Sequence, residues 1–144
     1  MLLNHEPKRQ RRAAFTLMEM LVVVAIIVAL AGIGGFFLLG QLEGAKKDTA
    51  QTQVKVTLSQ ACEAYSIKHG HFPDSLAALL VKDEIGGPYL KSEDYLYDPW
   101  STPSNKRPYQ YDASGTKNQS IQPDIWTTTP DGTVIIGNWP AKNR

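Results

Sequence analysis

An uninterrupted apolar segment constrains the fold of this chain more than any other feature. Twenty consecutive residues, Met20 to Leu39, carry no charge and are mostly Leu, Val, Ile, Ala and Phe. A helix of about twenty such residues spans the roughly 30 Å hydrocarbon layer of a bilayer. The segment is therefore predicted to be either a single membrane-spanning helix or the apolar part of a signal sequence.

The charges before this segment predict its orientation. Four basic residues precede it against one acid, Glu6; they are Lys8, Arg9, Arg11 and Arg12. Basic residues favour the cytoplasmic side, so the chain after Leu39 is expected beyond the membrane. An ordinary signal peptide that is cut after Ala29-Leu30-Ala31 is an alternative. Glu19 argues against it, because an insertion signal has no use for a carboxylate, which is costly in lipid.

The rest of the chain is nearly neutral. The formal net charge is +1 over 144 residues, and residues 15–144 hold 11 basic and 13 acidic side chains. Proteins that bind nucleic acid need a clear excess of Lys and Arg on the folded part. Nucleic acid is therefore not an expected partner. Once a membrane segment is subtracted, the length leaves room for one head domain.

The helix is expected to continue beyond the apolar segment. Residues 41–68 contain no Pro, and His69-Gly70 supplies a C-terminal stop. The apolar residues of this stretch recur at three- and four-residue steps and so form one stripe: Ala50, Val54, Leu58, Ala61, Cys62 and Tyr65. The second half of the helix is therefore predicted to be amphipathic and to pack against the head.

The remaining residues predict a small head with short strands. Ser75 is expected to cap a short helix at residues 76–80. Runs of β-forming residues follow at 109–111, 125–128 and 133–136, and Pro130-Asp131-Gly132 is a turn signal between the last two. The predicted fold class is α+β: a long N-terminal helix, membrane-spanning in its first half and amphipathic in its second, packed on a small C-terminal antiparallel sheet.

The most specific motif lies where the basic residues meet the apolar segment. It reads Lys8-Arg9-Gln10-Arg11-Arg12-Ala13-Ala14-Phe15-Thr16-Leu17-Met18-Glu19-Met20-Leu21. This resembles the N-terminus of type IV pilins and type II secretion pseudopilins, in which a basic leader and a small residue precede Phe-Thr-Leu-Ile-Glu. The resemblance implies that a prepilin peptidase cuts between Ala14 and Phe15 and methylates the new terminus. The family usually has Gly where Ala14 stands.

Glu19 would become the fifth residue of the mature chain. A carboxylate at the membrane edge needs a cationic partner, and cleavage creates an amine on the Phe15 of a neighbouring subunit. Such a pair would set the axial offset between subunits, which makes Phe15 and Glu19 the candidate assembly residues. The alternative is that Glu19 lies at headgroup depth near Arg12.

Motifs in the head narrow the resemblance. Asp98-Pro99-Trp100 followed by Tyr109-Gln110-Tyr111 is similar to the Asp-Pro-Trp-Gly-Asn-Pro-Tyr-Gln-Tyr signature of the major, or G-type, pseudopilins of type II secretion, with an insertion around residues 101–107. Gly137-Asn138-Trp139 resembles the C-terminal Asn-Trp of the same subunits. The resemblance implies a pilin-like fold and a structural role, not an enzyme.

The resemblance also implies a domain organisation: a leader at 1–14, a transmembrane and polymerisation helix at 15–39, and a periplasmic head at 40–144, with the amphipathic helix at 40–69 and loops and sheet at 70–144. The single-pass subunit would wait in the inner membrane and then polymerise into a periplasmic pseudopilus that drives export of folded proteins across the outer membrane. Expected partners are copies of itself, minor pseudopilins, the prepilin peptidase and the inner-membrane assembly platform. The alternatives are a type IV pilin for adhesion, motility or DNA uptake, and a secreted domain with an ordinary signal peptide.

The residues do not predict a metal or catalytic site. G-type pseudopilins bind calcium in a loop between the last strands, whereas here that loop is only residues 129–133 with one acid, Asp131. Calcium takes six or more oxygens, so Asp131 is interpreted as a turn residue and no cofactor is expected. His69 and His71 lack a Glu at metal-site spacing, and Cys62 lies on the apolar stripe.

The Ala14-Phe15 junction makes a prediction about processing. In cells with an active prepilin peptidase the protein should lose its first fourteen residues, and without the peptidase it should keep its full length. Mass and terminal sequencing of the mature protein test this, with a methylated Phe15 as the expected first residue. A chain that begins at Gly32 would indicate an ordinary signal peptide instead, and full length in both strains would contradict the leader assignment.

Overall fold

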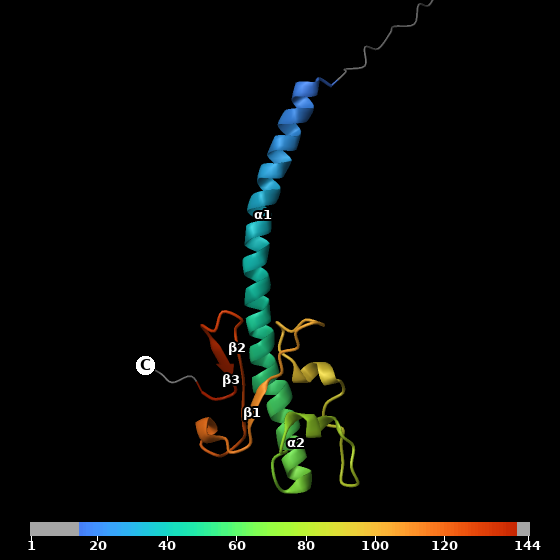
Figure 1. Cartoon of the computed structure of the whole chain (residues 1–144), viewed down its shortest axis with the longest axis vertical. Coiled ribbons are helices and arrows are strands. Elements are labelled where there is room, and N and C mark those ends of the chain that lie inside the picture. Colours follow the sequence, from blue (N-terminus) through green and yellow to red (C-terminus); the bar gives the residue numbers. More distant parts are fainter. Residues whose placement is uncertain (1–14, 141–144) are drawn as a thin grey trace, which may run out of the picture. The chain divides into compact units, whose positions relative to one another are not determined.

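The computed structural model describes residues 15–140. Helix α1 (Leu17–Thr52) leads through a π-helical segment, η1 (Gln53–Leu58), into helix α2 (Ser59–His69), so the apolar and amphipathic stretches belong to one helical run, as predicted (Figure 1). Gly70 ends the run with a φ of 78°, a left-handed conformation that suits glycine.

The described chain divides into two compact units between Gly40 and Gln41. The first unit consists of the apolar part of α1. A single helix cannot bury its own side chains, so this unit has no core. The second unit holds the rest of the helix and the whole head.

The head contains a three-stranded antiparallel sheet in the order β1-β2-β3. The strands are β1 (Gln110–Asp112), β2 (Asp124–Thr128) and β3 (Ile135–Gly137). All three predicted strands are present, which confirms the α+β, pilin-like fold. β3 starts two residues later than predicted because Thr133 and Val134 take part in the turn.

Three short 3-10 helices lie outside the sheet. They are η2 (Leu76–Leu80), η3 (Glu93–Leu96) and η4 (Thr116–Asn118). The helix predicted at 76–80 is thus present as a 3-10 turn, but the predicted cap is wrong, because the Ser75 side chain makes no capping hydrogen bond. The tighter turn places Leu76 and Leu79 on the same side, and both are buried in the core.

The predicted stripe of the helix forms one wall of the core. Ala50, Val54, Leu58, Ala61 and Cys62 are buried, and Tyr65 packs at the edge. The facing residues come from η2, β2, β3 and the loops of the head: Leu76, Leu79, Leu90, Trp100, Tyr109, Ile125 and Ile136. The amphipathic half of the helix is therefore held in place by the head, as its periodicity predicts.

Polar contacts fix the end of the sheet against the π-helical segment. Ser59 donates its hydroxyl hydrogen to the carbonyl of Val54 at 2.7 Å, and the Asn138 side-chain amide donates to the Ser59 oxygen at 3.1 Å. The Asn138 side-chain oxygen accepts the backbone N–H of Ile125 at 3.0 Å. Asn138 of the Gly-Asn-Trp motif thus joins β2 to the widened turn of the helix.

The Asp98-Pro99-Trp100 motif makes hydrogen bonds to both α1 and β2. The buried carboxylate of Asp98 accepts hydrogen bonds from Arg107 Nε at 3.0 Å and from the Thr127 hydroxyl at 2.7 Å. Trp100 donates its indole N–H to Glu43 on α1 at 2.8 Å. This hydrogen bond is the main cause of the lowered pKa of Glu43. The motif therefore connects the helix, the inserted loop and β2.

His69 connects the end of α2 to the loop that follows η2. Its Nε2 lies 2.7 Å from Asp83 Oδ2, and its Nδ1 lies 3.0 Å from the carbonyl oxygen of Tyr65. Both ring nitrogens face acceptors, so both contacts are hydrogen bonds only when the ring carries two protons. The hydrogen bond to Asp83 raises the pKa of His69, and the same bond lowers the pKa of Asp83.

This pair predicts a pH dependence of stability. Because the folded-state pKa of His69 is raised, its contribution is complete below the ordinary value of 6.5 and is lost as the pH rises through the folded value. Asp83 contributes above its ordinary value of 3.8 and loses its contribution as the pH falls through the lowered value. Between about pH 6 and about pH 9, wild type should therefore lose more thermal stability than His69→Gln.

Melting curves of the full-length protein in detergent measure this difference. His71→Gln is the matched control, because the exposed His71 ring contacts the Phe72 carbonyl and no carboxylate. It should keep the pH dependence of wild type. Equal pH dependence in wild type and His69→Gln would contradict the prediction.

Candidate assembly site

Thr16 and Glu19 form reciprocal hydrogen bonds at the first turn of α1. The Thr16 hydroxyl oxygen accepts the backbone N–H of Glu19 at 3.2 Å. Glu19 Oε2 accepts the backbone N–H of Thr16 at 2.8 Å and its hydroxyl at 3.1 Å. This reciprocal arrangement is a capping box, which satisfies backbone donors that a helix N-terminus otherwise leaves unpaired.

The capping role of Glu19 is an addition to the sequence-based interpretation. The Thr-x-x-Glu spacing is the sequence signal of this cap, and it is compatible with an intersubunit or membrane-edge role of the carboxylate. Glu19 Oε1 accepts no hydrogen bond, and Glu19 makes no ion pair, within residues 15–140. Within the described residues, the carboxylate therefore uses one oxygen for its own helix, and its other oxygen accepts no hydrogen bond.

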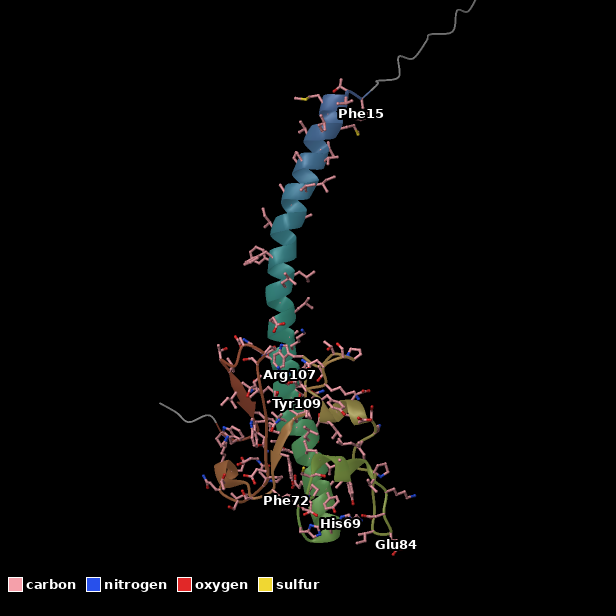
Figure 2. The ribbon with its side chains drawn as sticks, viewed as in Figure 1. Phe15, His69, Phe72, Glu84, Arg107 and Tyr109 are labelled. Atoms are coloured by element: carbon pink, nitrogen blue, oxygen red, sulfur yellow. The ribbon has the colours of Figure 1, made fainter. Side chains whose placement is uncertain are left out.

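Phe15, the second candidate assembly residue, begins the described part of the chain (Figure 2). Its side chain is 77% exposed and does not contact Glu19 through any hydrogen bond. Ala14, on the other side of the predicted cut, lies outside the described residues. The structure therefore brings Glu19 to Thr16 and leaves the Phe15 ring uncovered.

The apolar half of α1 is exposed along its whole length. The exposed fraction of its large apolar side chains ranges from 47% at Val23 to 81% at Phe36. By length and composition this helix could cross a membrane. Contiguous apolar surface of this extent is unstable in water and needs lipid or other protein around it.

The turn between β2 and β3 is organised by Asp131. Its carboxylate accepts the hydroxyls of Thr129 at 2.5 Å and Thr133 at 2.8 Å, and the backbone N–H of Thr133 at 3.2 Å. These hydrogen bonds, led by that from Thr129, lower the pKa of Asp131 to about 2. Asp131 is thus a turn residue, as predicted, and its oxygens are engaged within the turn.

Cys62, His69 and His71 each take part in packing or hydrogen bonds within the fold. Cys62 is fully buried, and desolvation raises the pKa of its thiol to about 12, which suppresses the reactive thiolate. His69 bonds to Asp83, and His71 contacts a backbone carbonyl. Among residues 15–140, no three His, Cys, Asp or Glu side chains gather in a group that could hold a metal ion.

Two family models match adjacent parts of this chain. The model described as "Type II secretion system (T2SS), protein G" matches residues 37–135, and that described as "Prokaryotic N-terminal methylation motif" matches residues 9–35. The chain belongs to the type II secretion system protein G family. The resemblance found in the N-terminal motif and in the head motifs is thereby confirmed.

Curated relatives agree with this assignment over nearly the whole chain. The Type II secretion system core protein G of Pseudomonas aeruginosa is 31% identical, with 92% of this chain and 98% of the relative aligned. That of Vibrio cholerae is also 31% identical, over 92% of this chain and 94% of the relative. That of Aeromonas hydrophila is 30% identical, over 94% and 98%. No solved structure gives a significant match.

This protein G family member should melt at the same temperature in EDTA and in millimolar calcium. The reason is that Asp131 is the one acid in the shortened loop and already bonds within the turn. A ligand at a hundredfold above its dissociation constant adds about 2.7 kcal/mol to the free energy of unfolding, which would raise the melting temperature by several degrees. Melting of the full-length protein in detergent tests this, and a calcium-dependent rise of that size would contradict it.

Proposed function

We propose that this chain is the structural subunit of a type II secretion pseudopilus, which polymerises in the periplasm and drives export of folded proteins across the outer membrane. Prepilin peptidase removes residues 1–14 and methylates Phe15. Residues 15–39 hold the subunit in the inner membrane, with the head in the periplasm, until the assembly platform extracts it. The uncovered apolar half of α1, in a chain of this family, is the observation that most supports this function.

After the helix leaves the membrane, the same helix of neighbouring copies covers its apolar side chains in place of lipid. In the membrane the apolar side chains contact lipid, and in the filament they contact the same helix of neighbouring subunits. Lipid tails are as apolar as Leu, so this exchange gives little net driving force of its own. The register between subunits must therefore be selected by polar groups and by contacts between heads.

Glu19 is the polar group best placed to select the register. Cleavage before Phe15 leaves the amide N–H of Thr16 intact, so the mature chain retains the capping box. The methylated amine of a neighbour's Phe15 keeps its positive charge and its N–H donors, and Glu19 Oε1 is available to accept one. Glu19 then has two roles, as the cap of its own helix and as the partner of the next subunit.

The proposed function includes neither a catalytic residue nor a cofactor. The partners are further copies of the chain, minor pseudopilins, the prepilin peptidase and the inner-membrane assembly platform. The match to the protein G model covers most of the head, which is the part that distinguishes such a subunit from a type IV pilin. Pseudopilus assembly is therefore favoured over adhesion, motility or DNA uptake.

Glu19→Gln separates the two roles of Glu19. Gln also serves in capping boxes, so the helix and membrane insertion should be retained. Loss of the charge removes a charge-assisted hydrogen bond worth about 1.5–3 kcal/mol, so the filament yield should fall at least about tenfold. The yield of filaments sheared from cells with the assembly machinery measures this.

Thr16→Val is the matched control, because it removes the capping hydroxyl and keeps the carboxylate. Loss of a cap costs about 1 kcal/mol of helix stability, so this variant should assemble better than Glu19→Gln. Unimpaired filaments from Glu19→Gln would restrict Glu19 to its capping role.

A further inference from the structure

A hollow with two lysines lies beside the C-terminal sheet. It has a volume of about 490 Å³ and is lined by Lys55 of η1, Lys117 of η4, Ile121 and Trp139, among others. A smaller hollow of about 240 Å³ shares Lys55 and Trp139 and continues along β3. No acidic side chain of the described residues lines either hollow.

Two aromatic rings hold one of the two lysines of this hollow in place. The Lys117 ammonium lies 4.0 Å from the ring centroid of Trp139 and 4.8 Å from that of Trp126, which restrains its position. Neither Lys55 nor Lys117 forms an ion pair within residues 15–140, whereas Arg107 lies 3.0 Å from a carboxylate oxygen. A carboxylate from outside the chain would relieve the repulsion between the two ammonium groups.

The apolar side chains at the hollow indicate that a segment docking there also carries an apolar side chain. Ile121 is 75% exposed and lines the hollow together with Trp139. A matching segment therefore carries an acidic side chain next to an apolar one. Both must project from the partner's surface to reach into the hollow.

Such a segment exists on the head itself. Glu84 and Ile85 form the exposed tip of the loop between η2 and η3, and Ile85 is 59% exposed. Asp83 shapes this tip, because its Oδ1 accepts the backbone N–H of Ile85 at 2.9 Å and that of Gly86 at 2.8 Å. The Asp83 carboxylate also binds His69, which anchors the loop to α2.

The loop that carries the tip and the segment that carries η4 and β3 lie apart on the head. Figure 2 shows Glu84 at the outer edge of the head, beyond the end of α2. In Figure 1 the yellow-green loop that carries it and the orange-to-red segment that carries η4 and β3 lie on opposite sides of α2. One head therefore cannot place its own tip into its own hollow.

We propose that Glu84 and Ile85 of one copy dock into the Lys55–Lys117 hollow of a second copy. The carboxylate of Glu84 meets the two ammonium groups, and the Ile85 side chain meets Ile121 and the Trp139 indole. Because the two surfaces differ and lie on opposite sides, the contact is heterologous and can repeat without closing, as a filament requires. The inference rests on the proposed polymerisation and adds a contact between heads to it.

Cysteine cross-linking in assembled filaments tests the contact directly. The full-length chain with Glu84→Cys and Lys117→Cys should give a ladder of covalent multimers when the filaments are treated with a short bis-maleimide. The native Cys62 is fully buried and should not react. Glu84→Cys with Lys91→Cys is the control pair, because Lys91 is exposed and outside the hollow, and it should give no ladder.

Charge reversal tests the same contact without a cross-linker. Lys55→Glu and Glu84→Lys should each lower the filament yield at least about fivefold, because like charges then face each other. The double variant should recover most of the yield. Lys55 is chosen over Lys117 because it makes no cation–π contact in the described residues, so its reversal disturbs no indole. Lys91→Glu is the matched control and should assemble like wild type.

The outcomes separate this contact from the proposed function. Filaments that form normally with Lys55→Glu and give no ladder from the 84–117 pair would overturn the head contact and leave pseudopilus assembly standing. A cross-link from position 117 to a different protein, with none to position 84, would overturn the second copy as the occupant. Absence of filaments from wild type, with the assembly machinery present, would overturn both proposals.

Discussion

One stripe of a single helix organises the folded head. Val54, Leu58 and Cys62 belong to one core with side chains from η2, the strands and the loops of the head, because none of those segments is large enough to form a core without the helix. Burial of this stripe stabilises the head through the hydrophobic effect, which does not depend on direction. The direction of each segment is then fixed by a few buried polar groups, Asp98 and Asn138 above all.

These polar groups give the Asp-Pro-Trp and Gly-Asn-Trp motifs a structural role in the head. Asp98 lies in the loop after η3 and accepts a hydrogen bond from Arg107 at the far end of the inserted residues. The two ends of the insertion are thereby held together, and Asp98 also bonds to Thr127 of β2. Asn138 holds the last strand to the widened turn at Ser59. Removing one partner of such a network leaves a buried polar atom unpaired, which costs more than the hydrogen bond contributes.

The two halves of the helix differ in how their apolar side chains are arranged and covered. In the second half, apolar residues face one side and the head covers them, so the helix and head are one folded unit. In the first half they face all sides, and no element within residues 15–140 covers them. Thr16 and Glu19 close the start of this half, so the exposed helix is well terminated even where nothing packs against it.

Local patterns in the sequence were sufficient for the helix, the strands and the turn. The apolar run, the stripe from Ala50 to Tyr65 and Pro130-Asp131-Gly132 each depend on residues within a few positions of one another, and the structure places all three as expected. The Thr-x-x-Glu cap was equally local and could have been found. Ser75 occupies the N-cap position with the extended backbone of a capping residue, but its side chain makes no capping hydrogen bond, which the residue type alone does not decide.

The sequence alone therefore determined that the chain has an apolar helix with a pilin-like N-terminus and a small α+β head. Tertiary structure decided the partners of Asp98, the π-helical turn beside Asn138 and the pairing of His69 with Asp83. These contacts join residues that lie far apart in the sequence, so no periodicity records them. Their geometry exists only once the helix stripe is buried, because burial brings the groups together and removes the water that would otherwise satisfy them.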